Sequence, residues 1–531
     1  IKTVLLLDGI DQICSEKLSE AGISVTIKAK ISKDDLLKEI KDYDAVVVRS
    51  ATRVTAEVLA AGSKLQLVGR AGTGTDNIDV DAATRAGVIV MNTPGGNTLS
   101  AAEHTCALIC SLPRFIPQAC ASLKAGAWDR KKYMGSELSG KTLAVIGLGR
   151  IGREVASRMQ SFNMTVIGYD PFVSAETAAQ WDIEALELEE IWPRADYITV
   201  HTPLLPHTRN LVGEKVLMQY CKPGVKIINV ARGGIVDEAA LLVALESGRC
   251  GGAGIDVFTS EPPTDLSLCR HPKVVCTPHL GASTIEAQER VALEIAEQIV
   301  TGNAGGPLTG LVNAQALAAC GTPAALPWLT LATSLGQVAS AVLAPSKSTT
   351  VTIQCYGDDV SPLARAVGPA VVVGILKAAG HSSANLVNFA TLASDNNITF
   401  QNSTSSERPS LLATAITQCL LVTVTTSAGS TSVMGSVSNG RAVLYAIQDC
   451  MWESGLPLSC TLLLFRASSG SPDTTLLGLG TAVAGKGGRL LSLVSSGQGS
   501  SEQYYAIRMT GDVIIPEAPA GAEFLAKLIF S

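Results

Sequence analysis

The chain has 531 residues, enough for about three or four domains. Hydrophobic residues make up 47% of it and charged residues 17%, a balance that excludes a disordered chain. The 41 Lys and Arg against 47 Asp and Glu give a net charge of −6, which argues against nucleic acid as a partner because phosphate binding needs concentrated positive charge.

The first ~90 residues alternate short apolar runs with amphipathic stretches. We expect strands at residues 3–7, 24–27, 45–48, 67–69 and 88–90. A helix is expected over residues 32–43, because Ser32 followed by Asp35 is typical of a helix N-terminus. Strands that alternate with helices predict a parallel sheet with helices on both faces.

A second alternating series runs from about residue 97 to residue 279, with strands expected at residues 142–146, 165–169, 197–200, 226–230, 254–257 and 274–277. A further helix is expected to begin at Ser283 and to end near Gly302. Two such series predict two doubly wound domains with a cleft between them. We assign residues 1–96 and 285–313 to one of these domains and residues 97–284 to the other.

The chain after residue 302 is at first linker-like, because Gly, Ala and Pro dominate residues 302–307 and 314–327. A strand at 350–355 and a helix at 363–379 indicate an intervening α/β module over residues 314–457. In the last module, residues 458–531, we expect a strand, a helix, two strands and a helix at 462–465, 474–484, 490–494, 504–508 and 518–530. The predicted fold class is α/β, with two doubly wound parallel-sheet domains and two C-terminal α+β modules.

The apolar run that ends at Ile146 leads directly into the sequence GLGRIG at residues 147–152. Gly147 allows the tight turn, Gly149 lets a pyrophosphate approach the backbone, and Gly152 lets the following helix pack on the strand. Asp170 ends the next strand, 18 residues after Gly152. An Asp at this position accepts two ribose hydroxyls and repels a 2′-phosphate, so the pattern favours NAD over NADP.

Six histidines are candidates for a catalytic base. His104 lies inside the helical run 101–112 and is expected to be packed there, while His207, His271 and His381 lie in loops or in the remote tail. His201 and His279 each follow a predicted strand at the carboxyl edge of the sheet, where ligands bind. A role in a cofactor loop stays open for His201. The Gly-Ala turn after His279 lets a ligand come close.

Three chemically different side chains follow three successive predicted strands. Arg232, Glu261 and His279 each come a few residues after the end of one of these strands. Because the carboxyl ends of parallel strands meet at one edge of a sheet, all three side chains can face one cleft. Together they supply a fork for a carboxylate, an orienting acid and a proton acceptor.

The chain resembles the NAD-dependent D-2-hydroxyacid dehydrogenases in its glycine turn and in three further runs: ARGG at 231–234, EPP at 261–263 and PHLGA at 278–282. Another three runs narrow the resemblance to the animal-type, phosphoglycerate-oxidising branch with a C-terminal tail: RAGTG at 70–74, MNTPGGN at 91–97 and HTPL at 201–204. The resemblance implies NAD-dependent oxidation of 3-phospho-D-glycerate to 3-phosphooxypyruvate, the first step of the phosphorylated serine pathway.

The resemblance also implies that residues 1–96 and 285–313 form a substrate-binding domain and residues 97–284 a Rossmann NAD-binding domain, and it implies roles for individual residues. His279 takes the proton of the C2 hydroxyl, Glu261 orients its imidazole, and Arg232 holds the substrate carboxylate. The implied cofactor contacts, besides the three glycines and Asp170, are Thr73, Arg150, Ile151, Thr202, Val230, Ala231, Asp256, Leu280, Gly281 and Ala282. The implied substrate contacts are Arg49, Arg70 and Asn97, and no metal is expected. The basic run 130–132 is either a further partner for the phosphate or a solvated face.

The thirteen cysteines show no CxxC spacing and many lie in apolar runs, so neither a disulfide framework nor a zinc site is expected. The apolar runs are interrupted well short of the ~18–20 residues of a membrane span. The first apolar run is charged at both ends, unlike a signal peptide. We therefore expect a cytoplasmic protein with no membrane partner, and the resemblance implies a homo-oligomer, a tetramer.

The last module resembles an ACT domain, a regulatory fold that often binds an amino acid. In the bacterial relatives that bind serine, the loop after the first strand usually carries a Gly directly after a Pro. Here Asp473 follows Pro472, and an Asp adopts an open turn less freely than Gly. We expect a tail that supports assembly without strong inhibition by serine.

Two alternative functions stay open. A glyoxylate or hydroxypyruvate reductase of the same family lacks a long folded tail and often takes NADP. An NAD(H)-sensing scaffold that is similar to the C-terminal binding protein corepressors keeps the same Arg, Glu and His, so these residues cannot separate it from an enzyme. Corepressor tails look disordered, whereas residues 462–465 and 504–508 are typical of core strands.

Overall fold

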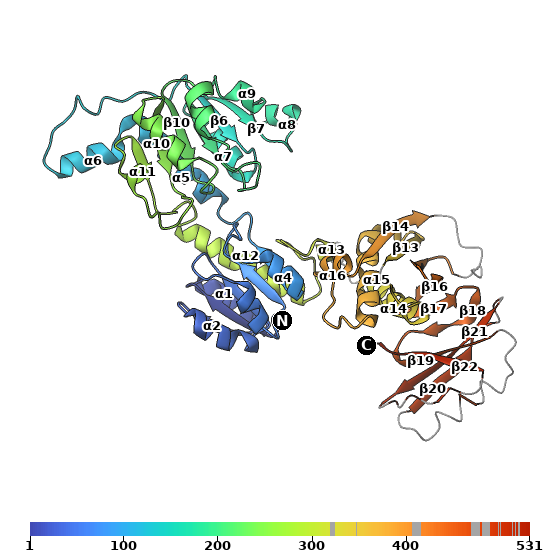
Figure 1. Cartoon of the computed structure of the whole chain (residues 1–531). Coiled ribbons are helices and arrows are strands. Elements are labelled where there is room, and N and C mark those ends of the chain that lie inside the picture. The colour runs from blue at the N-terminus through green and yellow to red at the C-terminus, as the bar shows by residue number, and fades with distance from the viewer. Residues whose placement is uncertain are drawn as a thin grey trace.

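The computed structural model describes residues 1–318, 324–346, 348–405, 416–468, 478–479, 489–497, 499, 501–511, 513, 515, 517–518 and 521–530. Four sheets of five, seven, six and four strands follow one another along this part of the chain. Figure 1 shows the first two as helix-covered sheets joined by α12, and the last two side by side at the C-terminal end. The expected α/β class is confirmed, and the C-terminal modules are rich in strands.

The first sheet is parallel throughout, with the order β2-β1-β3-β4-β5. Its strands are β1 (Thr3–Leu7), β2 (Ser24–Lys28), β3 (Ala45–Val48), β4 (Leu67–Arg70) and β5 (Ile89–Asn92). The helices between them are α1 (Gln12–Glu20), α2 (Lys33–Glu39), α3 (Ala56–Ala61) and α4 (Val80–Ala86). The start of α2 is as expected, because the Ser32 side chain accepts a hydrogen bond from the Asp35 N–H. The helix ends earlier than expected, in a short 3-10 turn at Ile40–Asp42.

The second sheet is also parallel, with the order β12-β11-β10-β9-β6-β7-β8. Its strands are β6 (Thr142–Ile146), β7 (Thr165–Tyr169), β8 (Glu184–Ala185), β9 (Tyr197–Val200), β10 (Val225–Asn229), β11 (Cys250–Ile255) and β12 (Val274–Cys276). Its helices are α5 (Thr98–Ser111), α6 (Ile116–Lys124), α7 (Arg150–Gln160), α8 (Ala175–Ala179), α9 (Leu188–Ile191), α10 (Glu238–Glu246) and α11 (Ser267–Arg270). The strand expected at 254–257 is wrong in its bounds, because the glycines of β11 carry no side chains that would reveal its start at Cys250.

The chain leaves the second sheet through α12 (Ile285–Asn303) and returns to the first. Ile295 and Ile299 of α12 are buried in the same core as Val4 and Leu6 of β1. Beyond the helix, the Asn313 side chain accepts a hydrogen bond from the N–H of Val90 at 2.9 Å. The segment up to Asn313 is thus bound to the outer strand of the first sheet.

The third sheet has the order β14-β13-β15-β16-β17-β18, and only its first pair is parallel. Its strands are β13 (Thr349–Tyr356), β14 (Ile398–Ser405), β15 (Cys419–Thr426), β16 (Gly429–Ser438), β17 (Arg441–Ile447) and β18 (Cys450–Pro457). The helices are α13 (Gln315–Ala318), α14 (Leu326–Val342), α15 (Ala364–Ala378) and α16 (Phe389–Asp395). The segment expected to be linker therefore contains α13 and the first turn of α14.

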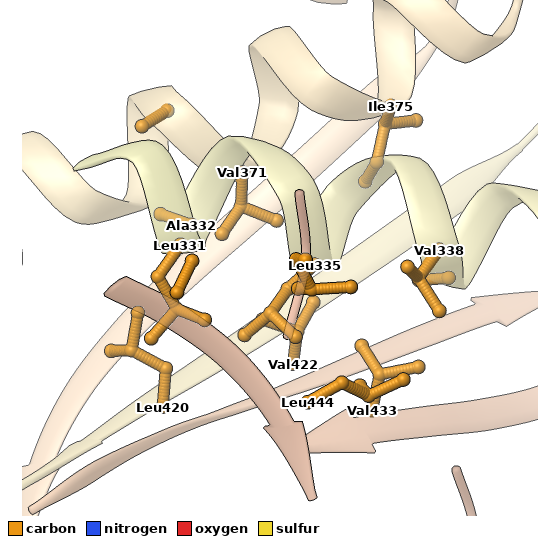
Figure 2. Packing of buried hydrophobic residues seen from close by; sticks show 14 of the residues in the cluster. Leu331, Ala332, Leu335, Val338, Val371, Ile375, Leu420, Val422, Val433 and Leu444 are labelled. Carbon is orange, nitrogen blue, oxygen red and sulfur yellow. The ribbon is translucent and has the colours of Figure 1, made fainter. Parts of the chain in front are cut away.

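Helix α14, which the sequence did not predict, fills the centre of this module. Figure 2 shows Leu331, Leu335 and Val338 of α14 against Leu420 and Leu444 of the sheet. Thr330, Thr333 and Gln337 lie at helical spacing on the less buried side of α14, but the Ala- and Pro-rich residues 314–327 at its start are typical of a linker and hide the helix in the sequence.

The fourth sheet is antiparallel and has the order β20-β21-β19-β22. Its strands are β19 (Cys460–Ser468), β20 (Arg489–Ser495), β21 (Glu502–Thr510) and β22 (Ala522–Phe530). The helix expected at 518–530 is wrong, because β22 pairs with β19 along its whole length. The helix expected at 474–484 lies outside the described residues, apart from 478 and 479, and so does the turn at Pro472 and Asp473.

One face of the fourth sheet is buried against the module of residues 314–457. Leu462 and Leu464 of β19 and Tyr504 of β21 belong to the same core as α14. Their neighbours Leu463, Phe465 and Tyr505, which point to the opposite face, form a separate small core. The two C-terminal modules therefore share a hydrophobic core.

One described segment, Ser361–Ala378, is long and apolar enough to cross a membrane by length and composition, contrary to the expectation from the sequence. The bent pair Thr98–Arg114 and Ile116–Lys124 passes the same test only if it is counted as one span. Most of Ser361–Ala378 is buried inside the module, where α15 packs against α14. Burial in a protein core accounts for its apolar side chains.

Candidate active site

His279 and Glu261 form a hydrogen-bonded pair at the carboxyl edge of the second sheet. His279 Nδ1 lies 2.7 Å from Glu261 Oε2, and the N–H of Phe258 donates to the other carboxylate oxygen at 3.0 Å. Both side chains are partly exposed, which leaves the imidazole open to a ligand. A pocket of about 430 Å³ opens beside the pair and is lined by Pro262, Leu266 and neighbouring residues.

The pair is electrostatically matched. The hydrogen bond to Glu261 is the largest cause that raises the pKa of His279, and it outweighs the opposing effect of burial. Burial by itself raises the pKa of Glu261, but hydrogen bonds from His279 and from the Phe258 N–H lower it overall. The carboxylate therefore stays ionised next to an imidazole with increased proton affinity.

Asp256, an implied cofactor contact, is fully buried and holds the loop that carries His279. It accepts hydrogen bonds from the N–H groups of Leu280 at 2.7 Å and Gly281 at 2.8 Å, and from the hydroxyl of Thr277 at 2.6 Å. Burial raises the pKa of Asp256, yet hydrogen bonds from His104, Thr277 and the loop amides lower it on balance. In the structure, these contacts of the Asp256 carboxylate hold the loop of His279 in place.

Arg232 lies at the end of β10 and reaches across to the first domain. Its Nε donates to Asp76 at 3.1 Å, and its Nη1 donates to the carbonyl of Ala231 at 2.6 Å. A side chain at Gly74 would clash with Arg232 Nη2, so the glycine lets the loop approach the guanidinium. No sequence pattern pointed to Asp76, which holds the guanidinium of Arg232 in place.

Arg49 and Arg70 stand on the first-sheet side of the same cleft. Burial lowers the pKa of Arg70 to about 10, and the charges of Arg49 and Arg232 act in the same direction. Arg49 and Arg232 are thus close enough to Arg70 for their charges to act on it, and the carboxylates of Asp76 and Asp8 partly offset this effect. Arg70 also donates to the side chain of Asn77 at 3.2 Å, which keeps the guanidinium in place. A cluster of like charges of this kind is stabilised by an anionic ligand.

Thr73 and Asn97 meet where the chain passes between the two sheets. The Thr73 hydroxyl donates to Asn97 Oδ1 at 2.7 Å, and the Asn92 side chain donates to the Thr73 carbonyl at 2.6 Å. The structure therefore brings an implied cofactor contact and an implied substrate contact together.

The glycine turn has the geometry that a dinucleotide needs. Gly147 has φ +99°, a conformation that favours glycine, and a side chain at Gly152 would clash with the Gly147 carbonyl. The space beside Gly149 is open within 4 Å. Thr202 contributes a buried hydroxyl without a hydrogen-bond partner in the described structure. These features fit NAD, whose pyrophosphate would lie against the turn at the start of α7.

Asp170 ends β7 as predicted. One of its carboxylate oxygens accepts from the N–H of Leu148 and the other from the N–H of Phe172, both at 2.9 Å. A carboxylate has about four acceptor positions, so two remain for ribose hydroxyls. The side chain thus also ties the glycine turn to the end of β7.

The remaining implied cofactor residues follow elements of the second sheet. Arg150 and Ile151 begin α7, Val230 and Ala231 follow β10, and Leu280, Gly281 and Ala282 follow His279. Burial lowers the pKa of His201 to about 4, so this histidine is neutral at physiological pH. The structure does not bring the basic run 130–132 into the arginine cluster, because Lys132 lies near Asp129 and over the ring of Tyr133. The twelve cysteines in the described part of the chain are free.

His104 is the residue that the sequence reasoning missed. It lies on α5 as expected, but its Nε2 is 2.9 Å from the hydroxyl of Thr277 and 3.4 Å from Asp256. Only the pairing of α5 with the loop after β12 reveals this contact, since the two residues are 173 positions apart.

Two family models match the chain. Residues 106–281 match the NAD binding domain of the D-isomer specific 2-hydroxyacid dehydrogenases, and residues 325–447 match the D-3-phosphoglycerate dehydrogenase intervening domain. The D-3-phosphoglycerate dehydrogenase of Homo sapiens is 48% identical over 507 residues, 94% of each chain. That of Rattus norvegicus is 45% identical over 533 residues, 99% of this chain and 98% of the relative.

Solved structures match the first two sheets. A glyoxylate reductase from Paecilomyes thermophila is 29% identical with a TM-score of 0.54. The match covers 59% of this chain and 99% of the reductase chain. The Aquifex aeolicus D-lactate dehydrogenase, complexed with NAD and lactic acid, is 29% identical with a TM-score of 0.51. That match covers 57% of this chain and 96% of the lactate dehydrogenase chain.

The fold and the cofactor turn, together with these matches, define an NAD-dependent dehydrogenase of the D-2-hydroxyacid class. Relatives of nearly equal length are 45% and 48% identical to this chain, which narrows the assignment within this class. The chain belongs to the D-3-phosphoglycerate dehydrogenase family.

Proposed function

We propose that the chain oxidises 3-phospho-D-glycerate to 3-phosphooxypyruvate with NAD, and that Arg232, Glu261 and His279 are its catalytic residues. The main support is the 2.7 Å hydrogen bond between His279 and Glu261, in a cleft where three arginines converge. A 2-hydroxyacid dehydrogenase needs an oriented base for the hydroxyl proton and cations for the carboxylate. This cleft contains both.

His279 acts as the base. Because Glu261 accepts the Nδ1–H, the imidazole has its free lone pair on Nε2, which takes the proton of the C2 hydroxyl. Glu261 stabilises the imidazolium that results, as an ionised carboxylate next to a developing positive charge. In the reverse direction the same imidazolium returns the proton.

Arg232 binds the substrate carboxylate and polarises the C2 oxygen. Its Nε donates to Asp76 and its Nη1 to the Ala231 carbonyl, which fixes the plane of the guanidinium and, among the described residues, leaves Nη2 available to a ligand. Arg49 and Arg70 bind the phosphate from the side of the first sheet. Their mutual repulsion with Arg232 decreases when a dianionic phosphate enters.

NAD, when bound, accepts the hydride that leaves C2 of the substrate. The glycine turn and the start of α7 would hold its pyrophosphate, and Asp170 would hold its ribose. The implied contacts Thr73, Thr202, Val230 and Ala231 complete its binding groove. Asp170 disfavours a 2′-phosphate by charge repulsion, which selects NAD.

We further infer that the four sheets mark four domains, residues 1–96 with 285–313, 97–284, 314–457 and 458–531. The boundaries fall between the sheets. We propose that the protein is a cytoplasmic homo-oligomer, a tetramer. Self-association is supported by the exposed apolar side chains of Ile116, Leu123, Trp128 and Met134, on and after α6.

Steady-state rates of NADH formation test the substrate. D-glycerate is the matched control for 3-phospho-D-glycerate, since it lacks only the phosphate. We expect kcat/KM to be at least about 100-fold higher for the phosphorylated substrate, because the arginines are left unpaired without it. Faster reduction of glyoxylate or hydroxypyruvate than of 3-phosphooxypyruvate would indicate a reductase instead. NADH binding without turnover of any substrate would indicate a nucleotide-sensing scaffold.

A further inference from the structure

We propose that His104 is a positioning residue that fixes the loop of His279 through the hydroxyl of Thr277, and thereby couples this loop to helix α5. The proposal concerns the geometry of the base and rests on the role of His279 given above. It adds to the reaction a side chain that touches neither substrate nor cofactor.

The loop needs such support because its backbone is strained at the base itself. His279 has φ +55°, a left-handed conformation that is costly for a residue with a side chain. Its N–H donates to the carbonyl of Asp256 at 2.9 Å, and the next two amides donate to the Asp256 carboxylate. Any motion of Asp256 or Thr277 would therefore move the imidazole.

The direction of the hydrogen bonds defines what His104 does. The Thr277 hydroxyl has one hydrogen, and it donates this hydrogen to Asp256 at 2.6 Å, because the ionised carboxylate can only accept. The oxygen of Thr277 must then accept from His104 Nε2, which lies 2.9 Å away. His104 therefore carries its hydrogen on Nε2, and the chain of bonds runs from His104 through Thr277 to Asp256.

The same face of α5 also binds the far end of the loop. Ser100 lies one turn before His104, and its hydroxyl is 2.6 Å from that of Thr284. Between these contacts, a side chain at Gly281 would meet the backbone of Ala101 at 4.0 Å. Helix α5 thus holds both ends of the segment 277–284, while Asp256 holds its centre.

Helix α5 begins at the boundary between the two sheets. Its N-cap residue, Asn97, accepts from the hydroxyl of Thr73, in the loop that also contacts Arg232 through Asp76. A series of contacts thus runs from the loop of residues 73–76 along α5 to Thr277. His104 is the last side chain in this series of contacts before the catalytic loop.

The test compares two substitutions of the full-length enzyme. His104→Leu removes the donor at similar volume, whereas His104→Gln places an amide N–H close to the position of Nε2. We expect His104→Leu to lower kcat about tenfold, as for loss of a buried hydrogen bond next to a charge, with the Kd for NADH changed less than twofold. His104→Gln should recover kcat to within about threefold of wild type. His381→Leu, in the remote module, is the matched control and should leave kcat unchanged.

Thr277 supplies a second variant if His104→Leu folds poorly, which thermal melting would reveal. Thr277→Val should lower kcat as His104→Leu does, and the double variant should be no slower than Thr277→Val alone, because both break one chain of bonds. Wild-type kcat in His104→Leu, an equal loss in the Leu and Gln variants, or additive losses in the double variant would each overturn the proposal. The comparison uses whichever 2-hydroxy acid the enzyme oxidises best, so a wrong substrate assignment would show in the wild type and not as failure of this test.

Discussion

His279 combines a strained backbone with a charged partner, and both follow from neighbours on other strands. Glu261 reaches it from the loop after β11, and Asp256 holds the amides that follow it. The sequence predicted that Arg232, Glu261 and His279 face one cleft, because strand order and chain direction suffice for that. It could not predict Asp76 or His104, since their partners lie 156 and 173 residues away.

At the residue scale, Glu261→Gln should change the pH dependence of the reaction. The base must be neutral to accept a proton, so the rate of oxidation falls as the pH drops through the raised pKa of His279. Removing the main cause of that increase should move the acid limb of kcat/KM to lower pH and should lower kcat at least about tenfold. A pH profile measures both. An acid limb that stays at the same pH would show that Glu261 does not control the titration of His279. Glu20→Gln on α1, far from the site, is the control variant.

A second residue prediction concerns the choice of cofactor. Asp170→Ala should weaken NAD binding by about 1–3 kcal/mol, the range for hydrogen bonds to a charged acceptor. The loss includes the contacts with the N–H groups of Leu148 and Phe172, so the glycine turn should also become less fixed. Titration with NADH and NADPH should show a smaller preference for NADH than in wild type, while Glu176→Ala on α8 serves as the control. Equal use of NAD and NADP by the wild type would contradict the role of Asp170.

At the scale of elements, the parallel strands were predictable because each is a short apolar run bounded by turns. Strand β22 was not, because the residues before it and the spacing of Glu523 and Lys527 indicate a helix. In the sheet, Glu523 pairs instead with Arg466 at 2.7 Å, and the ring of Phe524 lies edge-to-face with that of Phe465. Tertiary pairing thus overrides a local preference. Helix α14 was missed because the Ala- and Pro-rich residues at its start are typical of a linker.

Helix α14 should determine the stability of the C-terminal modules without affecting catalysis. Leu335→Ala should lower their free energy of unfolding by about 2–5 kcal/mol, because Leu335 is fully buried between α15 and the third sheet. Leu326→Ala is the matched control on the same helix, and its exposed side chain should contribute less than about 0.5 kcal/mol. Chemical denaturation or calorimetry would measure the change in the free energy of unfolding for both variants. Equal effects of the two variants would contradict the core seen around α14.

At the scale of the whole molecule, the dehydrogenase part should function without the tail. The described contacts between the first sheet and the third module include the Asn385 side chain with the Gly87 carbonyl, and the ion pair of Arg85 with Asp395. A chain ending at residue 318 keeps Asn313 on β5 and both parallel sheets. We expect it to fold as a smaller oligomer and to retain kcat within about threefold. An inactive or unfolded product would show that the tail is needed to form the cleft.

The full-length protein should not be strongly inhibited by serine. This expectation rests on Asp473 after Pro472 in the sequence, which both lie outside the described residues. Assays of NADH formation at increasing serine concentration test it. Sub-millimolar inhibition by serine that disappears on truncation after residue 318 would contradict it.

The most direct test of the role of His279 as the base is a single-turnover measurement on His279→Ala. With enzyme in excess over 3-phospho-D-glycerate and saturating NAD, we expect the rate of NADH formation to fall roughly 100-fold or more, because the proton acceptor is lost. The Kd for NADH should be nearly unchanged, since the glycine turn and Asp170 remain intact. NADH formation at the wild-type rate would contradict the account and would place the base elsewhere in the cleft.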